Sequence, residues 1–131
     1  MKSIFALLLI GILCSTKTDD NKFDEYQGGR FGYAYVSLKL YKDSTFTYTE
    51  WNHTGSVKDS GIWQKNKQYF YLNSYSWTSW TTRQGKSDMS HRFIMQKFTI
   101  VGDTLKLIAK HRRDTDYFDT YYKLCKVANG N

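Results

Sequence analysis

The feature that most constrains the fold is a strict alternation of residue types over residues 33–41. Ala34, Val36, Leu38 and Leu40 occupy every second position, and tyrosines or polar residues fill the positions between them. Successive side chains of a β-strand point to opposite faces of the sheet. The pattern therefore predicts a strand with one aliphatic, buried face and one mixed face.

The rest of the chain repeats this combination of strand and turn signals. Lys42-Asp43-Ser44 has the composition of a tight turn, so a second strand should return directly after it. The further strands expected are residues 45–51, 62–64, 69–75, 91–100, 104–110 and 117–126, and the segments 52–56, 58–61 and 82–90 are expected to be loops. Alternation within these strands places the following side chains on the core face: Phe70, Leu72, Leu105, Leu107 and Ala109.

Beyond the N-terminus the chain has no helical periodicity, and it contains no proline. Seven or eight strands joined mainly by short turns predict an all-β, antiparallel up-and-down meander. Closing such a meander removes exposed sheet edges, so we expect a small barrel or a curved half-barrel. A two-sheet sandwich is the alternative.

The N-terminus has the pattern of a secretion signal. One positive charge, Lys2, precedes an uninterrupted apolar run over residues 4–13. The run is shorter than the roughly 20 apolar residues of a spanning helix. It fits the apolar region of a signal helix that directs export.

Cys14 ends this run, and a polar stretch follows it. The arrangement resembles a bacterial lipoprotein signal, in which the cysteine is lipidated and becomes the first residue of the mature chain. This resemblance implies a signal over 1–14, a polar tether over 15–30 and a barrel-like domain over 31–127. It also implies a cell-envelope protein attached to a membrane only through its acyl chains. Leu13 stands where a small residue is usual, which leaves cleavage beyond Cys14 and free secretion as the alternative.

Three strand segments resemble those of the small bacterial lipocalin-like lipoproteins. They are Thr45-Phe46-Thr47-Tyr48, Gly61-Ile62-Trp63 with the strand that follows it, and the hairpin around Val101-Gly102-Asp103-Thr104-Leu105. The resemblance covers about residues 31–126 and implies a lipocalin-like barrel in the cell envelope. The Gly-x-Trp of true lipocalins lies in the first strand, whereas here it lies well inside the chain. The resemblance implies no activity, because a fold does not fix a function.

Residues suited to catalysis or metal binding are few and scattered. The two glutamates are Glu25, in the expected tether, and Glu50, which shares a strand face with Phe46 and Tyr48 and could point into a barrel. The three histidines show no metal-binding spacing (His53, His91 and His111). The segment 114–119 contains three aspartates, but it lacks the glycine and the closing glutamate of a calcium loop (Asp114, Asp116 and Asp119). Cys125 is expected to be a small buried hydrophobic side chain in a strand. We therefore expect no enzyme, no metal and no cofactor.

Aromatic residues make up 18% of the chain and suggest a ligand surface. Trp77 and Trp80 stand among serines and threonines in residues 74–82, and their change of parity indicates a bulge or a strand end. Aromatic rings beside hydroxyl groups can hold a sugar or line an apolar cavity. Cross-strand aromatic pairs can equally serve only to stabilise a sheet, by about 0.2–1 kcal/mol each. The candidate ligand-binding residues are Trp51, Trp63, Tyr75, Trp77 and Trp80.

Two functions remain open at this point. The first is a non-catalytic envelope protein, expected to be a monomer, that binds a small apolar or glycan-like ligand through these aromatic residues. The second is an interaction protein that docks a polyanion or another envelope protein through a basic surface, since the net charge is +7. That surface would contain Lys39, Lys65, Lys67, Arg83, Lys86, Arg112 and Arg113. The export signal argues against nucleic acid as the partner.

Overall fold

The computed structural model describes residues 22–30, 32–109 and 123–128, and for residues 87–91 only the backbone. The expected signal with Cys14, and the segment 111–119 with its histidine, arginines and aspartates, lie outside these ranges. The strands are β1 (Phe23–Gly28), β2 (Ala34–Tyr41), β3 (Thr45–Asn52), β4 (Gly55–Asn66), β5 (Tyr69–Ser74), β6 (Thr78–Thr82), β7 (Gly85–His91), β8 (Gln96–Val101), β9 (Thr104–Ile108) and β10 (Cys125–Lys126).

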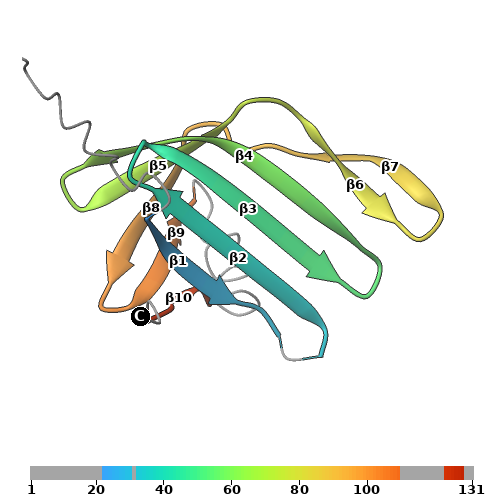
Figure 1. Cartoon of the computed structure of the whole chain (residues 1–131), viewed down its shortest axis with the longest axis horizontal. Helices are drawn as coiled ribbons and strands as arrows, with labels where there is room; N and C mark the ends of the chain where they lie inside the picture. The colour runs from blue at the N-terminus through green and yellow to red at the C-terminus, as the bar shows by residue number, and fades with distance from the viewer. Residues whose placement is uncertain (1–21, 31, 110–122, 129–131) are drawn as a thin grey trace, which may run out of the picture.

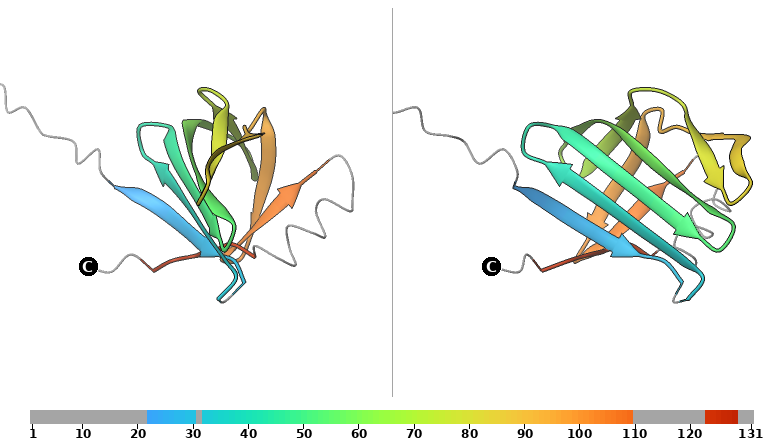
Figure 2. Two further views of the ribbon diagram at one scale, coloured as in Figure 1. Left: turned by 90° about the vertical axis from the view of Figure 1, so that its right-hand side faces the viewer. Right: turned by 45° about the vertical axis from the view of Figure 1, so that its right-hand side comes forward.

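These strands form one antiparallel sheet that closes into an eight-stranded barrel. The order around the barrel is β1, β2, β3, β4, β5, β8, β9 and β10, so chain order is kept apart from the excursion through β6 and β7. β10 pairs with β1 through Tyr26↔Lys126 and Gln27↔Cys125, which closes the ring. In Figure 1, β8 and β9 lie behind the wall formed by β1 and β2, and Figure 2 shows the same strands from two further sides. The predicted up-and-down barrel is confirmed, and the sandwich alternative is wrong because the ten described strands share a single sheet.

The long strand β4 explains how the excursion joins the barrel. One edge of β4 pairs with β3 from Gly55 to Ile62. The other edge pairs with β6 at Gly55 and Ser56 and with β5 from Gly61 onward. The β6–β7 hairpin therefore extends the barrel wall beyond the end of β5, where it projects from the body of the molecule (Figure 1).

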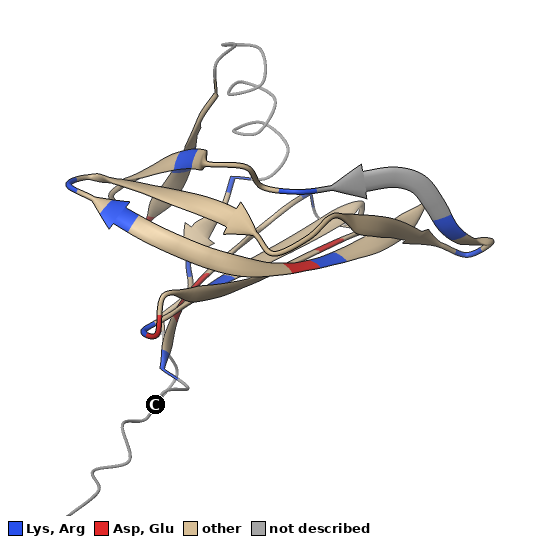
Figure 3. Cartoon of the chain, turned by 90° about the horizontal axis from the view of Figure 1, so that it is seen from above, with Lys and Arg blue, Asp and Glu red and all other residues tan. Residues whose placement is uncertain are grey.

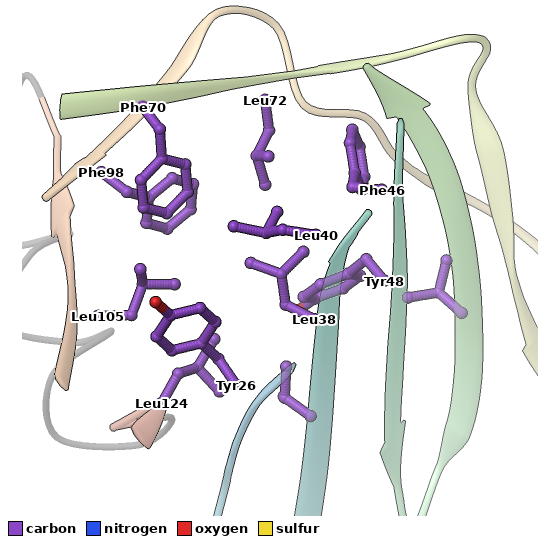
Figure 4. Close-up of a cluster of buried hydrophobic side chains, with 12 residues drawn as sticks. Tyr26, Leu38, Leu40, Phe46, Tyr48, Phe70, Leu72, Phe98, Leu105 and Leu124 are labelled. Atoms are coloured by element: carbon purple, nitrogen blue, oxygen red, sulfur yellow. The ribbon is translucent and has the colours of Figure 1, made fainter. Parts of the chain in front are cut away.

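The barrel interior is filled by side chains from the alternating strand positions. Figure 4 shows the buried cluster, which comprises Tyr26, Val36, Leu38, Leu40, Phe46, Tyr48, Val57, Phe70, Leu72, Phe98, Leu105 and Leu124. Burying one such side chain stabilises the fold by about 1.5–3 kcal/mol. The aliphatic face of residues 33–41 and the inward positions of Phe70, Leu72 and Leu105 are as the alternation predicted.

Phe93, in the connection between β7 and β8, packs against one end of this cluster. Its ring lies 5.0 Å from the ring of Tyr48 and 5.8 Å from that of Phe46, in edge-to-face geometry. Its backbone N–H donates to Ser74 Oγ at 2.8 Å, and its carbonyl accepts from Ser74 N–H at 2.9 Å. These contacts fix the connection across the wall at the end of β5.

The prediction of loops at 52–56 and 58–61 is largely wrong, because β4 extends from Gly55 to Asn66 and includes most of these residues. Only the Asn52–Gly55 corner turns, where the Asn52 side chain accepts from the backbone N–H groups of Thr54 and Gly55. The signals that suggested a second loop have other causes. Asp59 points inward, and a Cβ on Gly61 would overlap the backbone of Asn73 and the Phe46 ring. A glycine within a strand marks such a close approach of neighbouring groups.

Two further boundaries differ from the sequence prediction. Residues 82–90 were expected to be a loop, but β6 and β7 pair there around a turn at Arg83 and Gln84. These strands lack an aliphatic face, so alternation could not reveal them. β1 lies within 15–30, the span expected to be a tether, and its Tyr26 is only 2% exposed. This part of the span therefore belongs to the barrel.

Candidate ligand-binding groove

At one place along the barrel wall, the edge of β4 changes its pairing partner from β6 to β5. Two adjoining hollows lie there. The first has a volume of about 400 Å³ and is lined by Ser56, Lys58, Trp77, Thr78, Ser79, Thr81 and Lys86. The second has a volume of about 390 Å³ and is lined by Thr47, Tyr48, Thr49, Lys58, Asp59, Ser60, Ser76 and Thr78. Because Lys58 and Thr78 line both, the two hollows lie next to each other, and together we call them the β4–β6 groove.

Residues 75–77 cross this part of the wall between β5 and β6. The Tyr75 N–H donates to the Ser60 carbonyl at 3.0 Å, directly after β5 ends. Further along β4, at Ser56, the pairing partner is β6. The segment thus holds Ser76 and Trp77 against the outer side of β4, and Trp77 remains 58% exposed.

Strand register sets the opposite side of the groove. Trp51 is the direct partner of Ser56, and Thr49 is the direct partner of Lys58. Side chains on directly opposed residues lie about 4.5–5.5 Å apart at Cβ on the same face of the sheet. Trp51, which is 48% exposed, therefore stands beside Ser56 at the margin of the groove.

The base of the groove is tied to the barrel interior through Asp59. This residue is 7% exposed, and its carboxylate accepts from Ser74 Oγ at 2.5 Å, from the Ser60 N–H at 2.7 Å and from Thr78 Oγ1 at 3.5 Å. Ser74 Oγ also accepts from the Phe93 N–H. A buried carboxylate is tolerated when its oxygens are hydrogen-bonded in this way, and the network fixes the floor of the groove.

The predicted ligand residues lie in three different places. Trp51 and Trp77 border the β4–β6 groove, and Tyr75, 62% exposed, lies in the crossing segment beside it. Trp80 packs against the core at a β-bulge between Ser79 and Thr81, which confirms the irregularity expected from the change of parity. Gly55 leaves room for its indole, because a Cβ there would meet the ring.

Trp63 belongs to a different part of the surface. Its indole N–H donates to the Tyr41 carbonyl at 2.9 Å, and the side chain packs against the core cluster. It also lines an open hollow of about 940 Å³ together with Ile62, Tyr71 and Met95. The five predicted residues thus do not converge on one site.

The sequence pointed to the hydroxyl groups of residues 74–82 and to Lys86, but it did not single out Lys58 or Ser56, and it did not place these side chains together. Lys58 lies in a segment expected to be a loop, and Lys86 in another. Only the register of β4 with β3 and β6 brings them to one surface. The alternating threonines of β3, Thr45, Thr47 and Thr49, were a further visible signal of a hydroxyl-lined wall.

The cations expected to form a basic surface do not gather on one face. Lys65 lies near the end of β4 and Lys67 in the turn that follows it, whereas Arg83 and Lys86 belong to the β6–β7 hairpin. Figure 3 shows the basic positions of the described strands spread over both ends of the sheet. Lys39 lies on β2, and its ammonium sits 4.6 Å from the centre of the Phe23 ring. Arg112 and Arg113 lie outside the described residues.

The two glutamates have distinct surroundings. Glu50 points into the barrel, is 8% exposed and accepts a hydrogen bond from the Tyr48 hydroxyl at 2.6 Å. For Glu25, burial raises the carboxyl pKa, but hydrogen bonds from Gln27 and Ser37 and the nearby Lys39 lower it further, so the net pKa lies below its ordinary value. Both side chains therefore have structural partners within the barrel wall.

The remaining candidates are isolated from one another. The His53 ring lies 4.6 Å from the Tyr33 ring, and of His91 only the backbone is described. Cys125 Sγ lies 3.8 Å from Thr104 Oγ1 in a half-buried position. Within residues 22–30, 32–109 and 123–128 no three His, Cys, Asp or Glu side chains gather as a metal site would require. The same ranges contain no helix with the length and apolar character needed to cross a bilayer.

The fold and the groove define a small antiparallel β-barrel with an aromatic core, an architecture compatible with ligand binding. Comparisons with protein-family models, with curated proteins and with solved structures gave no match to this chain.

Proposed function

We propose that this protein is a non-catalytic binding protein of the cell envelope that holds a glycan-like ligand in the β4–β6 groove. The observation that carries the proposal is the lining of the groove. Hydroxyl side chains from β3, β4 and β6 line it, the exposed indole of Trp77 lies in its lining, and Trp51 is exposed on the strand position directly opposite Ser56.

A sugar presents hydroxyl groups along its edge and C–H groups on its faces. Serine and threonine hydroxyls both donate and accept hydrogen bonds, so they match the edge. Indole rings offer a flat apolar surface with a polar N–H, which matches the face. A purely apolar ligand would leave the hydroxyls of the groove without partners, at a cost for each polar group buried. The lining thus favours the glycan-like ligand over the apolar one.

The filled core supports this role by keeping the groove rigid. Val57 lies between Ser56 and Lys58 on β4, points into the interior and is 1% exposed. Groups held in place before binding lose less entropy when the ligand arrives. The envelope location rests on the apolar segment 4–13 and Cys14.

The test uses the full-length chain in mild detergent and a panel of soluble oligosaccharides, with binding followed by calorimetry and tryptophan fluorescence. At least one oligosaccharide should bind, and Trp77→Ala should weaken it about tenfold or more, the effect of losing a central aromatic contact. Val101→Ala is the matched control, because Val101 is 61% exposed at the end of β8 and is not among the residues that line the groove. No binding across the panel, or equal loss in both variants, would overturn the proposal.

A further inference from the structure

The charges in the β4–β6 groove are unequal. Among the groove residues, Lys58 and Lys86 are cationic and Asp59 is anionic. Lys58 lies on the outer face of β4 and lines both hollows, and Lys86 lies on β7 opposite Thr81 of β6. Thr81 is in turn the register partner of Ser56 on β4. Lys58 and Lys86 therefore approach the groove from two different strands.

Within the residues that the structure describes, Asp59 forms no ion pair with either of these cations. Successive side chains of a strand point to opposite faces, so Asp59 faces the interior while Lys58 faces the groove. The buried position of Asp59 and the exposure of Lys58 agree with this alternation. The hydrogen bonds from Ser60, Ser74 and Thr78 hold the carboxylate in that position.

Several other lysines of the barrel already have a partner. Lys97 sits 3.8 Å above the Tyr69 ring, Lys39 4.6 Å above the Phe23 ring, and Lys126 is 3.0 Å from the Asp24 carboxylate. Lys58 and Lys86 have neither an aromatic nor a carboxylate partner within the part of the chain that the structure describes. Their ammonium groups thus remain available to a ligand.

We propose that the ligand of the β4–β6 groove is an acidic glycan, whose carboxylate, sulfate or phosphate oxygens are bound by Lys58 and Lys86. This inference rests on the proposed function and specifies its ligand class. An ammonium group beside hydroxyl donors binds anionic oxygens through charge-assisted hydrogen bonds, which are stronger than neutral ones. The ring of the same sugar packs on the indoles at the margin. The lysines therefore recognise the acidic group and the indoles recognise the sugar ring of a single ligand.

The experiment compares matched acidic and neutral oligosaccharides on the full-length chain, using oligogalacturonate and the corresponding neutral galactose oligomer. The acidic ligand should bind at least tenfold more tightly at low salt, and its affinity should fall as salt rises, since screening weakens exposed charge contacts. Lys58→Gln and Lys86→Gln should each reduce that preference, because each weakens binding of the acidic oligomer more than binding of the neutral one. Lys42→Gln is the control, because Lys42 is an exposed lysine in the β2–β3 turn.

The outcomes separate the two proposals. Equal binding of both oligomers would overturn the acidic-ligand inference and leave the glycan-binding function standing. Binding of the acidic oligomer that survives both lysine substitutions would also overturn it. If inorganic sulfate bound as tightly as the acidic oligomer, the groove would recognise an anion without its sugar, which would contradict the inference. Failure of every oligosaccharide would remove the proposed function itself.

Discussion

The hydrogen-bond network of Asp59, Ser74 and Phe93 beneath the groove can be tested through its contribution to the free energy of unfolding. Ser74→Ala removes one hydroxyl that serves two partners, since it donates to the Asp59 carboxylate and accepts from the Phe93 N–H. Losing a hydrogen bond to a charged group costs about 1.5–3 kcal/mol, and leaving a buried N–H without a partner costs about 1–3 kcal/mol. Water can recover part of both losses, because Phe93 is only half-buried. We expect the free energy of unfolding to fall by about 2–4 kcal/mol.

Urea unfolding followed by circular dichroism measures this change, provided that the slope with denaturant stays the same. Ser79→Ala is the matched control, because Ser79 is an exposed serine of β6, and surface changes usually stay within about 0.5 kcal/mol. A loss below about 0.5 kcal/mol for Ser74→Ala would refute the network as a stabilising element.

Three further results are expected. Leu72→Ala, at a fully buried position, should destabilise the barrel by about 2–5 kcal/mol in the same urea assay, and an effect as small as that of Val101→Ala would contradict the core described above. Gly55→Ala should displace the Trp80 indole, because the added Cβ would lie 2.5 Å from its Nε1, and an unchanged tryptophan emission spectrum would argue against that packing. The folded pKa of Glu25 lies below its ordinary value of 4.5, so its ionised form stabilises the fold above about pH 4.5 and that contribution is lost as the pH falls through the lowered value. Glu25→Gln should therefore narrow the difference in unfolding midpoint between pH 6 and pH 3, and an unchanged difference would contradict the hydrogen bonds assigned to this carboxylate.

The barrel could be predicted from sequence where strands have one buried and one exposed face. Residues 33–41 alternate because β2 packs Val36 and Leu38 inside and leaves Tyr35 outside, so periodicity and burial carry the same information. The β8–β9 hairpin was found for the same reason, helped by the turn at Gly102, whose φ of +61° suits glycine.

The groove could not be predicted in the same way. Its strands β6 and β7 contain mostly polar and small residues, so their pairing depends on backbone bonds and leaves no hydrophobic pattern to read. Lys58 and Lys86 are separated in sequence and meet only through the change of partner along β4. Tryptophans were visible from composition, but composition could not distinguish Trp77 at the surface from Trp80 against the core.

The pairing of β1 with β10 has a consequence for the order in which the chain can fold. The strands that close the barrel are the first and last described, so the closing contacts join residues about as distant in sequence as the domain allows. Such contacts form slowly, since a long loop must close before they stabilise anything. Until Cys125 and Lys126 are in place, β1 and β9 present unpaired edges that can pair wrongly with another chain. A folding catalyst or a crowded compartment would therefore affect this protein mainly in the late folding state in which β10 has not yet paired with β1 and β9.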